Sequence, residues 1–315
     1  MYCIGVDIGG MSVKVGVVDR DGHIVKKDRV VTDVAAGAHK IIVDIAELIK
    51  SMIDINDRDF LGIGIGCPGA INSVTGTVDR AFNLGWYKVP LAEELARIIN
   101  KRIKVSNDAN VAALGEAMYG SGRTYSDTIF LTLGTGVGGG IILNGKLYEG
   151  NESKGAELGH TVIALDGEQC SCGRRGCMEA YCSATALIRD TKRAMEADRS
   201  SKMWEFEGSL DGVDGRTAFE CSKQGDKAAI AVVDNYIKYL GEGMLNFANI
   251  FRPQAIILGG GVCAQGDYLV YKLKDYCKDR NYGFADTPRF DILTASLGND
   301  AGIIGAAGLI FSDIR

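Results

Sequence analysis

Apolar positions along this 315-residue chain fall into two patterns, short continuous runs and repeats with helical spacing. The first three runs, residues 2–7, 13–18 and 24–31, are separated by glycine-containing turns and predict three strands. From Lys40 onward, apolar side chains recur every three to four residues and predict a helix that reaches Met52. Further strands are expected at 60–66, 103–106, 128–133, 138–143, 146–148, 255–258 and 290–294, and further helices at 91–99, 109–118, 178–197, 226–249, 267–278 and 300–311. Strands that alternate with helices in this way indicate an α/β protein.

One arrangement of strands occurs twice in this pattern. A strand, a glycine loop, a strand, a tight turn and a third strand span residues 2–31 and again residues 128–148. A repeated unit predicts two related halves, each presenting a glycine loop to a shared cleft. We expect a first domain of about residues 1–118 plus 300–315 and a second domain of residues 119–299. The polar segment 200–216 is expected to be a surface excursion near a helix junction.

The composition narrows the classes of function. Lysine and arginine total 35 against 40 acidic residues, a net charge of −5, which argues against a nucleic-acid-binding surface. No segment approaches the ~18 uninterrupted apolar residues of a membrane span, and Met1 leads directly into Y-C-I-G-V-D with no basic-then-apolar secretion signal. Nine cysteines, an odd number that includes a metal-type cluster, suit a reducing cytosol better than a disulfide framework. We therefore expect a cytoplasmic protein that binds neither nucleic acid nor membranes.

A cluster of potential metal ligands lies in the middle of the chain: His160, Cys170, Cys172 and Cys177. Three cysteines and one histidine are the ligand set of a closed structural zinc site, so the cluster predicts bound Zn²⁺. Glu157 and Glu179 flank it, and a metal that ties the segment together would draw both acids and His160 toward one place. Such a group could bind a polyhydroxyl ligand such as a sugar. The alternative, plain burial as apolar residues, is expected for the scattered cysteines: Cys3, Cys67, Cys182, Cys221, Cys263 and Cys277.

Three glycine-rich turns follow predicted strands, at residues 9–10, 134–140 and 259–261. Glycine lets backbone N–H groups approach phosphate oxygens, although a turn after a strand is often glycine-rich for steric reasons alone. None of the three matches the G-x-x-x-x-G-K-[ST] phosphate loop or opens a dinucleotide-binding unit with G-x-G-x-x-G. Three such loops in two repeated halves favour a nucleotide that lies across an interdomain cleft.

The segment S-N-D-A-N at 106–110 lies between a predicted strand and a predicted helix. Asn and Asp are preferred helix N-caps, and capping would explain one of Asn107, Asp108 and Asn110. Residues at the carboxyl end of a sheet strand commonly face the ligand in open α/β sheets. A carboxylate at this position could accept the proton of an attacking hydroxyl group.

Taken together, these residues resemble the ROK family (repressor, open reading frame, kinase) of the actin-like ATPase superfamily, and the resemblance spans essentially the whole chain. D-I-G-G at 7–10 resembles the family's first phosphate motif, and L-G-T-G-V-G-G-G at 133–140, continuing to G-A-E-L-G-H, resembles its signature. C-x-C-G-x-x-G-C-x-E at 170–179 resembles its zinc motif, and L-G-G-G-V at 258–262 its adenosine-side motif.

The resemblance implies an ATP-dependent hexose kinase with two similar ribonuclease H-like α/β domains that close over a cleft. It implies that Asp108 is the general base for a sugar hydroxyl, that Asp7 helps to position Mg²⁺, and that the His160 and cysteine cluster holds zinc. The residues implied for sugar binding are Gly69, Asn83, Asn107, Asp108, Glu157, His160 and Glu179. The residues implied for ATP binding are Asp7, Gly9, Gly10, Met11, Ser12, Thr135, Gly136, Gly138, Gly260 and Gly261.

One departure concerns the first loop, which usually reads G-G-T-K in the family. Here Met11 and Ser12 replace the hydroxyl and the lysine, while Lys14 remains two positions further on. These replacements affect how the loop binds the terminal phosphate and which phosphoryl donor is used.

Glucose, phosphorylated at its 6-hydroxyl, is the leading substrate; N-acetylmannosamine, allose and fructose are alternatives. A sugar-sensing repressor is a further alternative, against which the negative charge and the strand at Tyr2 argue. We expect a homodimer or a higher homo-oligomer.

Overall fold

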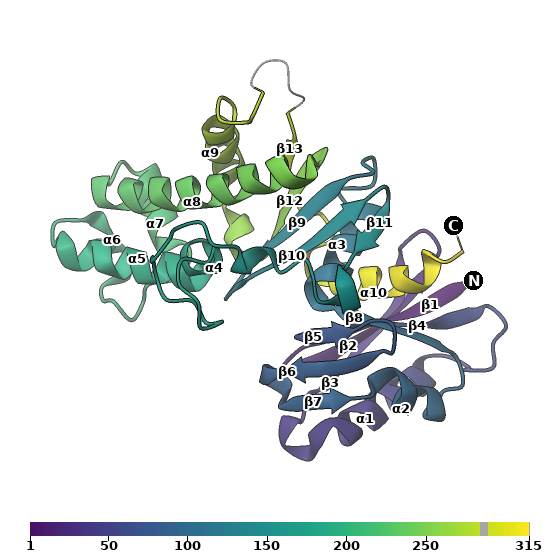
Figure 1. Cartoon of the computed structure of the whole chain (residues 1–315). Helices are drawn as coiled ribbons and strands as arrows, with labels where there is room; N and C mark the ends of the chain where they lie inside the picture. The colour runs from purple at the N-terminus through teal and green to yellow at the C-terminus, as the bar shows by residue number, and fades with distance from the viewer. Residues whose placement is uncertain (284–288, 315) are drawn as a thin grey trace. The chain divides into compact units, whose positions relative to one another are not determined.

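The computed structural model describes residues 1–283 and 289–314, which form two compact units (Figure 1). Unit 1 comprises Met1–Phe130, Gly140–Ala156 and Ala295–Arg315, and unit 2 comprises Leu131–Gly139 and Glu157–Thr294. The domain boundaries expected from the sequence stay a prediction. Within the part of the chain that the structure describes, no helix is both long and apolar enough to cross a membrane.

Two five-stranded sheets have the same strand order. In chain order, the strands lie third, second, first, fourth and fifth across each sheet, which confirms the repeat seen in the sequence. The first sheet, β3-β2-β1-β4-β8, consists of β1 (Tyr2–Ile8), β2 (Ser12–Asp19), β3 (Ile24–Val31), β4 (Phe60–Cys67) and β8 (Arg102–Asn107). The second sheet, β11-β10-β9-β12-β13, consists of β9 (Thr128–Leu133), β10 (Val137–Leu143), β11 (Lys146–Tyr148), β12 (Ala255–Gly259) and β13 (Asp291–Thr294). In the first sheet, β1, β4 and β8 are parallel, so their carboxyl ends meet at one edge.

The helices of the described residues are α1 (Gly37–Met52), α2 (Leu91–Ile98), α3 (Asp108–Tyr119), α4 (Glu179–Cys182), α5 (Ala184–Ala197), α6 (Lys202–Glu207), α7 (Thr217–Lys223), α8 (Lys227–Phe251), α9 (Asp267–Cys277) and α10 (Ala301–Phe311). Each long helix lies where the helical spacing of apolar residues predicts one. In α1, for example, the buried side chains include Ile41, Ile45 and Ile49, four residues apart, and they form one continuous stripe.

The first sheet is covered on both faces, and glycines decide how closely one helix approaches it. Ile4 and Val6 belong to the core that also contains the buried residues of α1, whereas Gly5 between them faces α10. A Cβ atom on Gly5 would overlap the carbonyl oxygen of Ile303. The sheet glycines therefore let the backbone of α10 lie directly on β1 and β4.

A buried carboxylate ties the C-terminal part of α3 to the segment before α10. Glu116 accepts hydrogen bonds from the backbone N–H groups of Ser121 (2.9 Å), Ser296 (3.1 Å) and Leu297 (2.8 Å). The hydroxyl groups of both serines also donate to it, at 3.0 and 3.3 Å. Several donors can offset the cost of burying this carboxylate, and they fix the start of α10 against α3.

The structure corrects three expectations about local structure. The helix expected at 178–197 is two helices, because Ser183 is extended (φ −77°, ψ 161°) and its hydroxyl accepts from the N–H of Ala186 as the cap of α5. The polar segment 200–216 contains α6, whose Met203 is fully buried, so this segment is more than a surface excursion. A third, three-stranded sheet was not expected: β5 (Ala70–Asn72), β6 (Thr77–Ala81) and β7 (Trp86–Val89). Its strands are too short to give a clear alternation of apolar and polar residues.

Candidate functional site

Unit 1 gathers polar residues at the carboxyl ends of its three parallel strands. Asp7 lies near the end of β1, Gly69 follows β4, and Asn107 ends β8, with Asp108 next to it at the start of α3. The Asn107 side-chain amide donates to the carbonyl oxygen of Gly69 at 3.1 Å, which joins two of these strand ends. Gly69 has φ +103°, and a Cβ atom there would overlap the carbonyl oxygen of Arg80, so only glycine fits this position.

The first glycine loop is braced from inside unit 1. The Gly9 N–H donates to the carbonyl oxygen of Ser12 at 3.0 Å, which closes the turn. Thr32, the residue after β3, donates its hydroxyl to the Gly9 carbonyl oxygen at 2.7 Å and its N–H to the Met11 carbonyl oxygen at 3.1 Å. Met11 itself is 88% exposed. The Asn83 side-chain nitrogen lies 3.7 Å from where a Cβ atom of Gly10 would be, so this candidate sugar contact borders the loop.

Lys14, which is not among the predicted ATP-binding residues, lies beside the first glycine loop. Strand pairing places Lys14 directly opposite Asp7, and its Nζ atom lies 3.1 Å from Asp7 Oδ2. Side chains two residues apart along a strand share a face, so Lys14 and Ser12 extend from the same face of β2. The lysine is half-buried and partly open to solvent. A cation therefore stands beside the glycine loop although the loop lacks the usual G-G-T-K sequence.

Asn107 and Asp108 divide the roles that the sequence left open. The Asn107 side chain is the N-cap of α3 and accepts from the N–H groups of Ala109 (2.9 Å) and Asn110 (3.4 Å). Desolvation is the largest effect on the pKa of the Asp108 carboxyl and raises it; the Ala109 N–H opposes the rise, and the Asp7 carboxylate adds to it. Asp108 is nevertheless exposed, so a ligand can reach its carboxylate. A raised pKa brings an aspartate closer to what a general base requires.

The cysteine cluster forms within unit 2. A ring nitrogen of His160 and the Sγ atoms of its three cysteine partners lie within 4.8 Å of one another, as in a metal site. The Cys172 and Cys177 sulfurs are 3.7 Å apart, and the Cys170 sulfur is 3.6 Å from His160 Nδ1. Zn–S and Zn–N bonds of about 2.3 and 2.05 Å give tetrahedral edges of about 3.8 and 3.6 Å. The donor set and these two separations therefore fit a tetrahedral zinc ion.

The protonation of the thiols bears on this fit. Burial, the largest effect, together with hydrogen bonds to the neighbouring thiols, raises the pKa of Cys177 to about 12. Burial also raises the pKa of Cys170, whereas the N–H of Arg174 lowers the pKa of Cys172. Three thiols in one place need a bound cation to be thiolates together near neutral pH.

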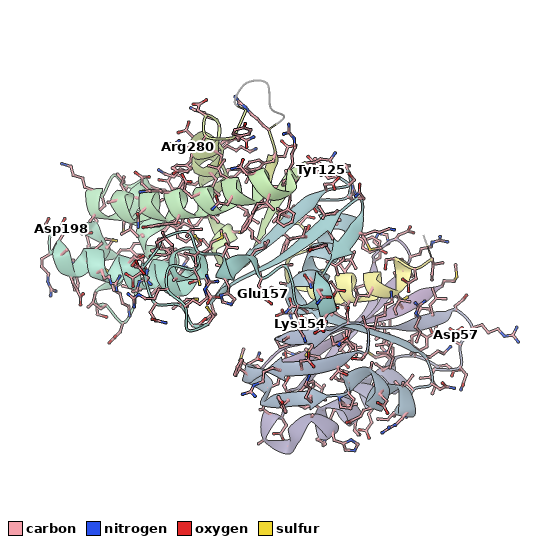
Figure 2. All side chains as sticks on the ribbon, viewed as in Figure 1. Asp57, Tyr125, Lys154, Glu157, Asp198 and Arg280 are labelled. Atoms are coloured by element: carbon pink, nitrogen blue, oxygen red, sulfur yellow. The ribbon has the colours of Figure 1, made fainter. Side chains whose placement is uncertain are left out.

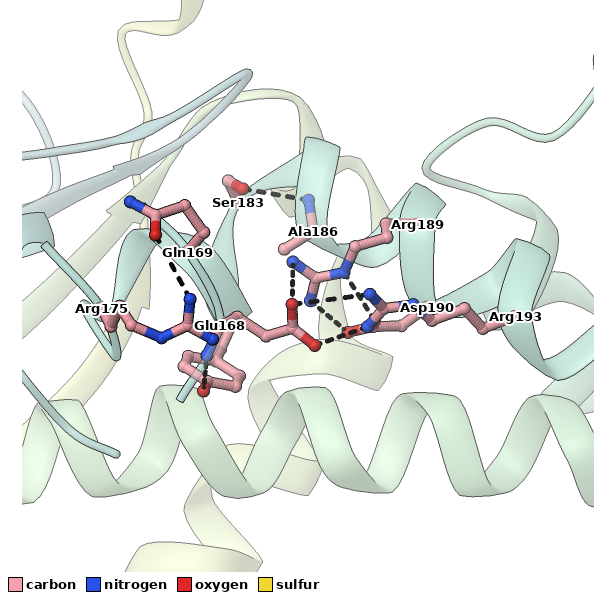
Figure 3. A network of polar contacts seen from close by, with 9 residues as sticks. Glu168, Gln169, Arg175, Ser183, Ala186, Arg189, Asp190 and Arg193 are labelled. Carbon is pink, nitrogen blue, oxygen red and sulfur yellow. Dashed lines mark hydrogen bonds and ion pairs between the residues drawn. The ribbon is translucent and has the colours of Figure 1, made fainter. Parts of the chain in front are cut away.

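A network of charged side chains fastens the segment before the cluster to α5 (Figure 3). The Glu168 carboxylate accepts from Arg193 at 2.6 Å and lies 3.8 Å from Arg189, both of which belong to α5. Its backbone N–H donates to the hydroxyl of Tyr181 at 2.7 Å. The side chain of the next residue, Gln169, accepts from Arg175 at 3.4 Å. The cysteine segment is therefore anchored at its start, outside the cluster itself.

Glu179 connects the cluster to the second glycine loop. One carboxylate oxygen accepts from the Val137 N–H at 3.1 Å, and the other accepts from the Ser171 hydroxyl at 2.6 Å. A Cβ atom on Gly136 would overlap the end of the Glu179 side chain, which would then have to move. Thr185 at the start of α5 donates its hydroxyl to the Thr135 carbonyl oxygen at 2.8 Å. Unit 2 thus joins the Glu179 carboxylate to a glycine loop, and the Cys170 sulfur lies 3.6 Å from both this carboxylate and the His160 imidazole.

The third glycine turn lies against the second within unit 2. Gly260 has φ +88°, and a Cβ atom there would lie 2.5 Å from the carbonyl oxygen of Leu133, at the end of β9. Gly260, Gly261 and Thr135 are exposed, whereas Gly136 and Gly138 are half-buried. Glu157 is also exposed, just before the turn that carries His160. Two of the three predicted glycine loops are therefore neighbours.

The sequence missed several residues that support these sites. Thr32, Thr185 and Ser171 brace the loops or Glu179 through single hydroxyl groups, and nothing in their local sequence marks them. Of the six scattered cysteines, five are buried as expected, whereas Cys263 is half-buried and donates its thiol to the Gly259 carbonyl oxygen at 3.1 Å. The other two histidines, His23 and His39, are exposed.

Two sheets of the same strand order, each with a glycine loop after its first strand, define an α/β protein of the actin-like ATPase class. The chain belongs to the ROK family, whose sequence pattern it matches across residues 3–312. It is 38% identical over 309 residues to a glucokinase of Thermotoga maritima, covering 98% of this chain and 96% of the relative. It is 36% identical over 319 residues to a glucokinase of Halalkalibacterium halodurans, covering 98% and 94%.

A solved structure supports the same class. The ROK family glucokinase of Streptomyces griseus, crystallised with glucose and AMPPNP, is 35% identical to this chain and superposes with a TM-score of 0.80. The match covers 98% of this chain and 99% of that one. The expected α/β fold of the actin-like ATPases is confirmed.

Proposed function

We propose that this protein is an ATP-dependent hexose kinase, a glucokinase that transfers the γ-phosphoryl group of ATP to the 6-hydroxyl of glucose. The observation that carries the proposal is full-length similarity to proteins named glucokinase, one of them crystallised with glucose and an ATP analogue. The polar group at the strand ends of unit 1 and the acid, imidazole and glycine loops of unit 2 supply the chemistry that this reaction requires.

In the proposed reaction, Asp108 accepts the proton of the sugar hydroxyl as the oxygen attacks the γ-phosphorus atom. The bond between that phosphorus and the bridging oxygen breaks, and ADP leaves with the bond's electron pair. Positioning and charge neutralisation supply most of the rate enhancement in phosphoryl transfer. The N–H groups of Gly10, Thr135 and Gly136, with Lys14 beside the first loop, would neutralise phosphate charge.

The residues proposed for sugar binding are Gly69, Asn83, Asn107, Asp108, Glu157, His160 and Glu179. The residues proposed for ATP binding are Asp7, Gly9, Gly10, Met11, Ser12, Thr135, Gly136, Gly138, Gly260 and Gly261. Carboxylates and amides bind any hexose hydroxyl, so the choice of glucose rests on the relatives. A cytoplasmic location and a homo-oligomeric state stay predictions.

Two metals belong to the proposal. Zinc would be held by His160, Cys170, Cys172 and Cys177, and it would order the segment that carries Glu157 and Glu179 without activating water. His160 would use Nδ1 for the metal, which leaves Nε2 for a sugar hydroxyl. Magnesium bound with ATP would neutralise phosphate charge. The Asp7 carboxylate, beside the first loop, would bind the magnesium ion directly or accept a hydrogen bond from its bound water.

A coupled ADP-release assay over a panel of sugars tests the function. Glucose should give the highest kcat/KM, at least tenfold above N-acetylmannosamine, allose and fructose, with ATP as donor. A preference for another hexose would keep the kinase and replace the substrate. ADP release with none of the sugars, from folded and metal-replete protein, would overturn the proposal.

A further inference from the structure

A carboxylate outside the proposed catalytic and binding residues joins three segments of unit 1. Glu149 follows β11, and its two oxygens accept hydroxyl donors from different elements. Ser106, on β8, donates to Oε1 at 2.5 Å, and Ser73, just after β5, donates to Oε2 at 2.8 Å. Ser106 is buried, and the other two residues are half-buried. Both carboxylate oxygens are therefore used inside the unit, an arrangement that fixes the side chain.

The segment that follows Glu149 has little regular structure of its own. Beyond a single turn at Asn151–Ser153, residues 150–156 form a loop with positive φ at Gly150 (71°), Glu152 (52°), Ser153 (59°) and Ala156 (62°). Non-glycine residues with positive φ are strained and persist only where surrounding contacts hold them. Something outside the loop must therefore keep it in this conformation.

The contacts that hold the loop converge on Glu149 and its partners. The Gly155 N–H donates to the Glu149 carbonyl oxygen at 2.7 Å and closes the loop. Ser153 forms a hydroxyl–hydroxyl contact with Ser73, the same serine that donates to the Glu149 carboxylate. Lys154 pairs with Asp79 of β6 at 3.1 Å, on the small sheet that also contains β5. The loop is thus attached to β5 and β6 by side chains and to β8 through Glu149.

The chain leaves unit 1 immediately after this loop. Ala156 is the last residue of that part of unit 1, and the next residue is Glu157, a proposed sugar contact (Lys154 and Glu157 are labelled in Figure 2). Asp108, by contrast, follows β8, whose backbone pairs with β4 through residues 102–107, and it begins a capped helix. The backbone at Asp108 is thus held by strand pairing and by the cap of α3, and Glu149 adds only a side-chain contact to Ser106. Glu157 follows the loop directly, and within unit 2 its carbonyl oxygen accepts from the His160 N–H at 3.1 Å, so the loop is one of two supports of its backbone.

We propose that Glu149 is a positioning residue for sugar affinity: it holds the loop at 150–156 and thereby the starting point of Glu157. The proposal rests on the proposed function, because it concerns the affinity of the sugar site. The proposed role concerns substrate binding and not the chemical step. Loss of Glu149 should weaken binding of glucose, while proton transfer by Asp108 and binding of ATP continue.

The test compares Glu149→Ala and Glu149→Gln with Glu152→Gln as the matched control. Glu152 lies in the same loop, is exposed, and pairs only with Lys154 among the contacts the structure gives it. Glucose Kd is measured by calorimetry without nucleotide, and kcat and KM for ATP by coupled assay. For Glu149→Ala we expect a rise in glucose Kd of about tenfold or more, with kcat and KM for ATP within threefold of the parent.

Glu149→Gln keeps the volume and one oxygen acceptor, so its glucose Kd should lie between those of the parent and Glu149→Ala. Glu152→Gln should stay within twofold of the parent. If Glu149→Ala does not fold, Glu149→Gln and Ser73→Ala replace it in the test. Both should raise glucose Kd and leave kcat and KM for ATP near the parent values. An unchanged glucose Kd in folded variants, or equal losses in all three quantities together with a lower Tm, would overturn the proposal. A parent protein that phosphorylates no hexose would instead overturn the proposed function, and the two failures are distinguishable because the parent is measured alongside.

Discussion

At the scale of single residues, Asp108 and Asn107 are neighbours with different tasks. Asn107 caps α3 through two backbone N–H groups, whereas Asp108, which accepts from the Ala109 N–H at 2.9 Å, is the proposed general base. The alternative that Asp108 serves as the N-cap does not agree with this geometry. Its pKa is raised, first by desolvation, so ionising it in the folded protein costs free energy.

We expect Asp108→Asn to lower kcat by about 10²–10⁴, the usual contribution of a general base, while glucose Kd changes little. The sign of the effect on stability follows from the raised pKa. A carboxyl group with a raised folded-state pKa favours folding only while it is protonated, and this contribution is lost as the pH rises through that pKa. Asparagine carries no charge, so the Tm of the variant at pH 7 should equal or exceed that of the parent.

The pH profile gives a second readout of the same residue. Activity should fall on the acid side as Asp108 becomes protonated, at a pH above the ordinary aspartate value of about 3.9. Rates and melting temperatures measured from pH 4.5 to 8 on parent and variant test both points. A kcat within threefold of the parent would exclude Asp108 as the base.

At the scale of elements, the first glycine loop is closed and braced although its sequence departs from G-G-T-K. Thr32 holds the loop backbone from β3, and Lys14 supplies a cation from β2. Met11 is exposed and offers no hydroxyl, so the loop relies on its backbone N–H groups and on Ser12.

Met11→Thr should lower KM for ATP by a few-fold if a hydroxyl at this position contacts phosphate, with KM for glucose unchanged. Val74→Thr is the matched control, because Val74 is equally exposed (88%) and lies away from the loop in the sequence. Kinetics at saturating glucose measure the effect. An unchanged or higher KM for ATP in Met11→Thr would show that Ser12 or Lys14 already provides the contact.

The crossing of α3 and α10 is a second feature at this scale. A Cβ atom on Gly305 would overlap the backbone carbonyl oxygen of Val111, whereas on Gly308 it would lie 3.0 Å from the flexible side chain of Met118. Gly305→Ala should therefore destabilise the protein by about 1–3 kcal/mol, as overpacking does. Gly308→Ala, on the same helix, should be near neutral, since alanine also favours helix formation. Denaturant midpoints measure the difference in stability between the two variants, and equal midpoints would contradict the backbone overlap at Gly305.

At the scale of the whole molecule, the proposed zinc belongs to unit 2 alone. Structural zinc contributes folding free energy to the segment it binds. Removing it, by chelation or by Cys172→Ser, should lower the stability of unit 2 more than that of unit 1. Cys263→Ser is the control, because that cysteine is half-buried and outside the cluster.

Elemental analysis and melting curves test this expectation. We expect one zinc per chain in the parent and in Cys263→Ser, and less in Cys172→Ser, with a lower first transition on heating. Hydrogen exchange would assign that transition to residues 157–182. Full activity and an unchanged melting curve in zinc-free protein would contradict a structural metal.

The sequence by itself determined the order of the strands of the two large sheets, the position of the long helices and the repeat, because apolar periodicity is a local property of the chain. It also determined the composition of the cysteine cluster, because four ligands of the right type occur within 18 positions. The break of the expected helix at Ser183 was hidden, since helical periodicity continues on both sides of one extended residue. The short strands β5, β6 and β7 were hidden because they carry too few residues to show alternation.

Only the tertiary structure decided which side chains meet. Lys14 reaches Asp7 because the hairpin register places them opposite each other, and Glu179 reaches the second glycine loop through the Val137 N–H. Glu149 joins Ser73 and Ser106, residues 76 and 43 positions away. Such contacts depend on register, on close backbone approach and on the folding of distant segments together, and no local pattern of residues encodes them.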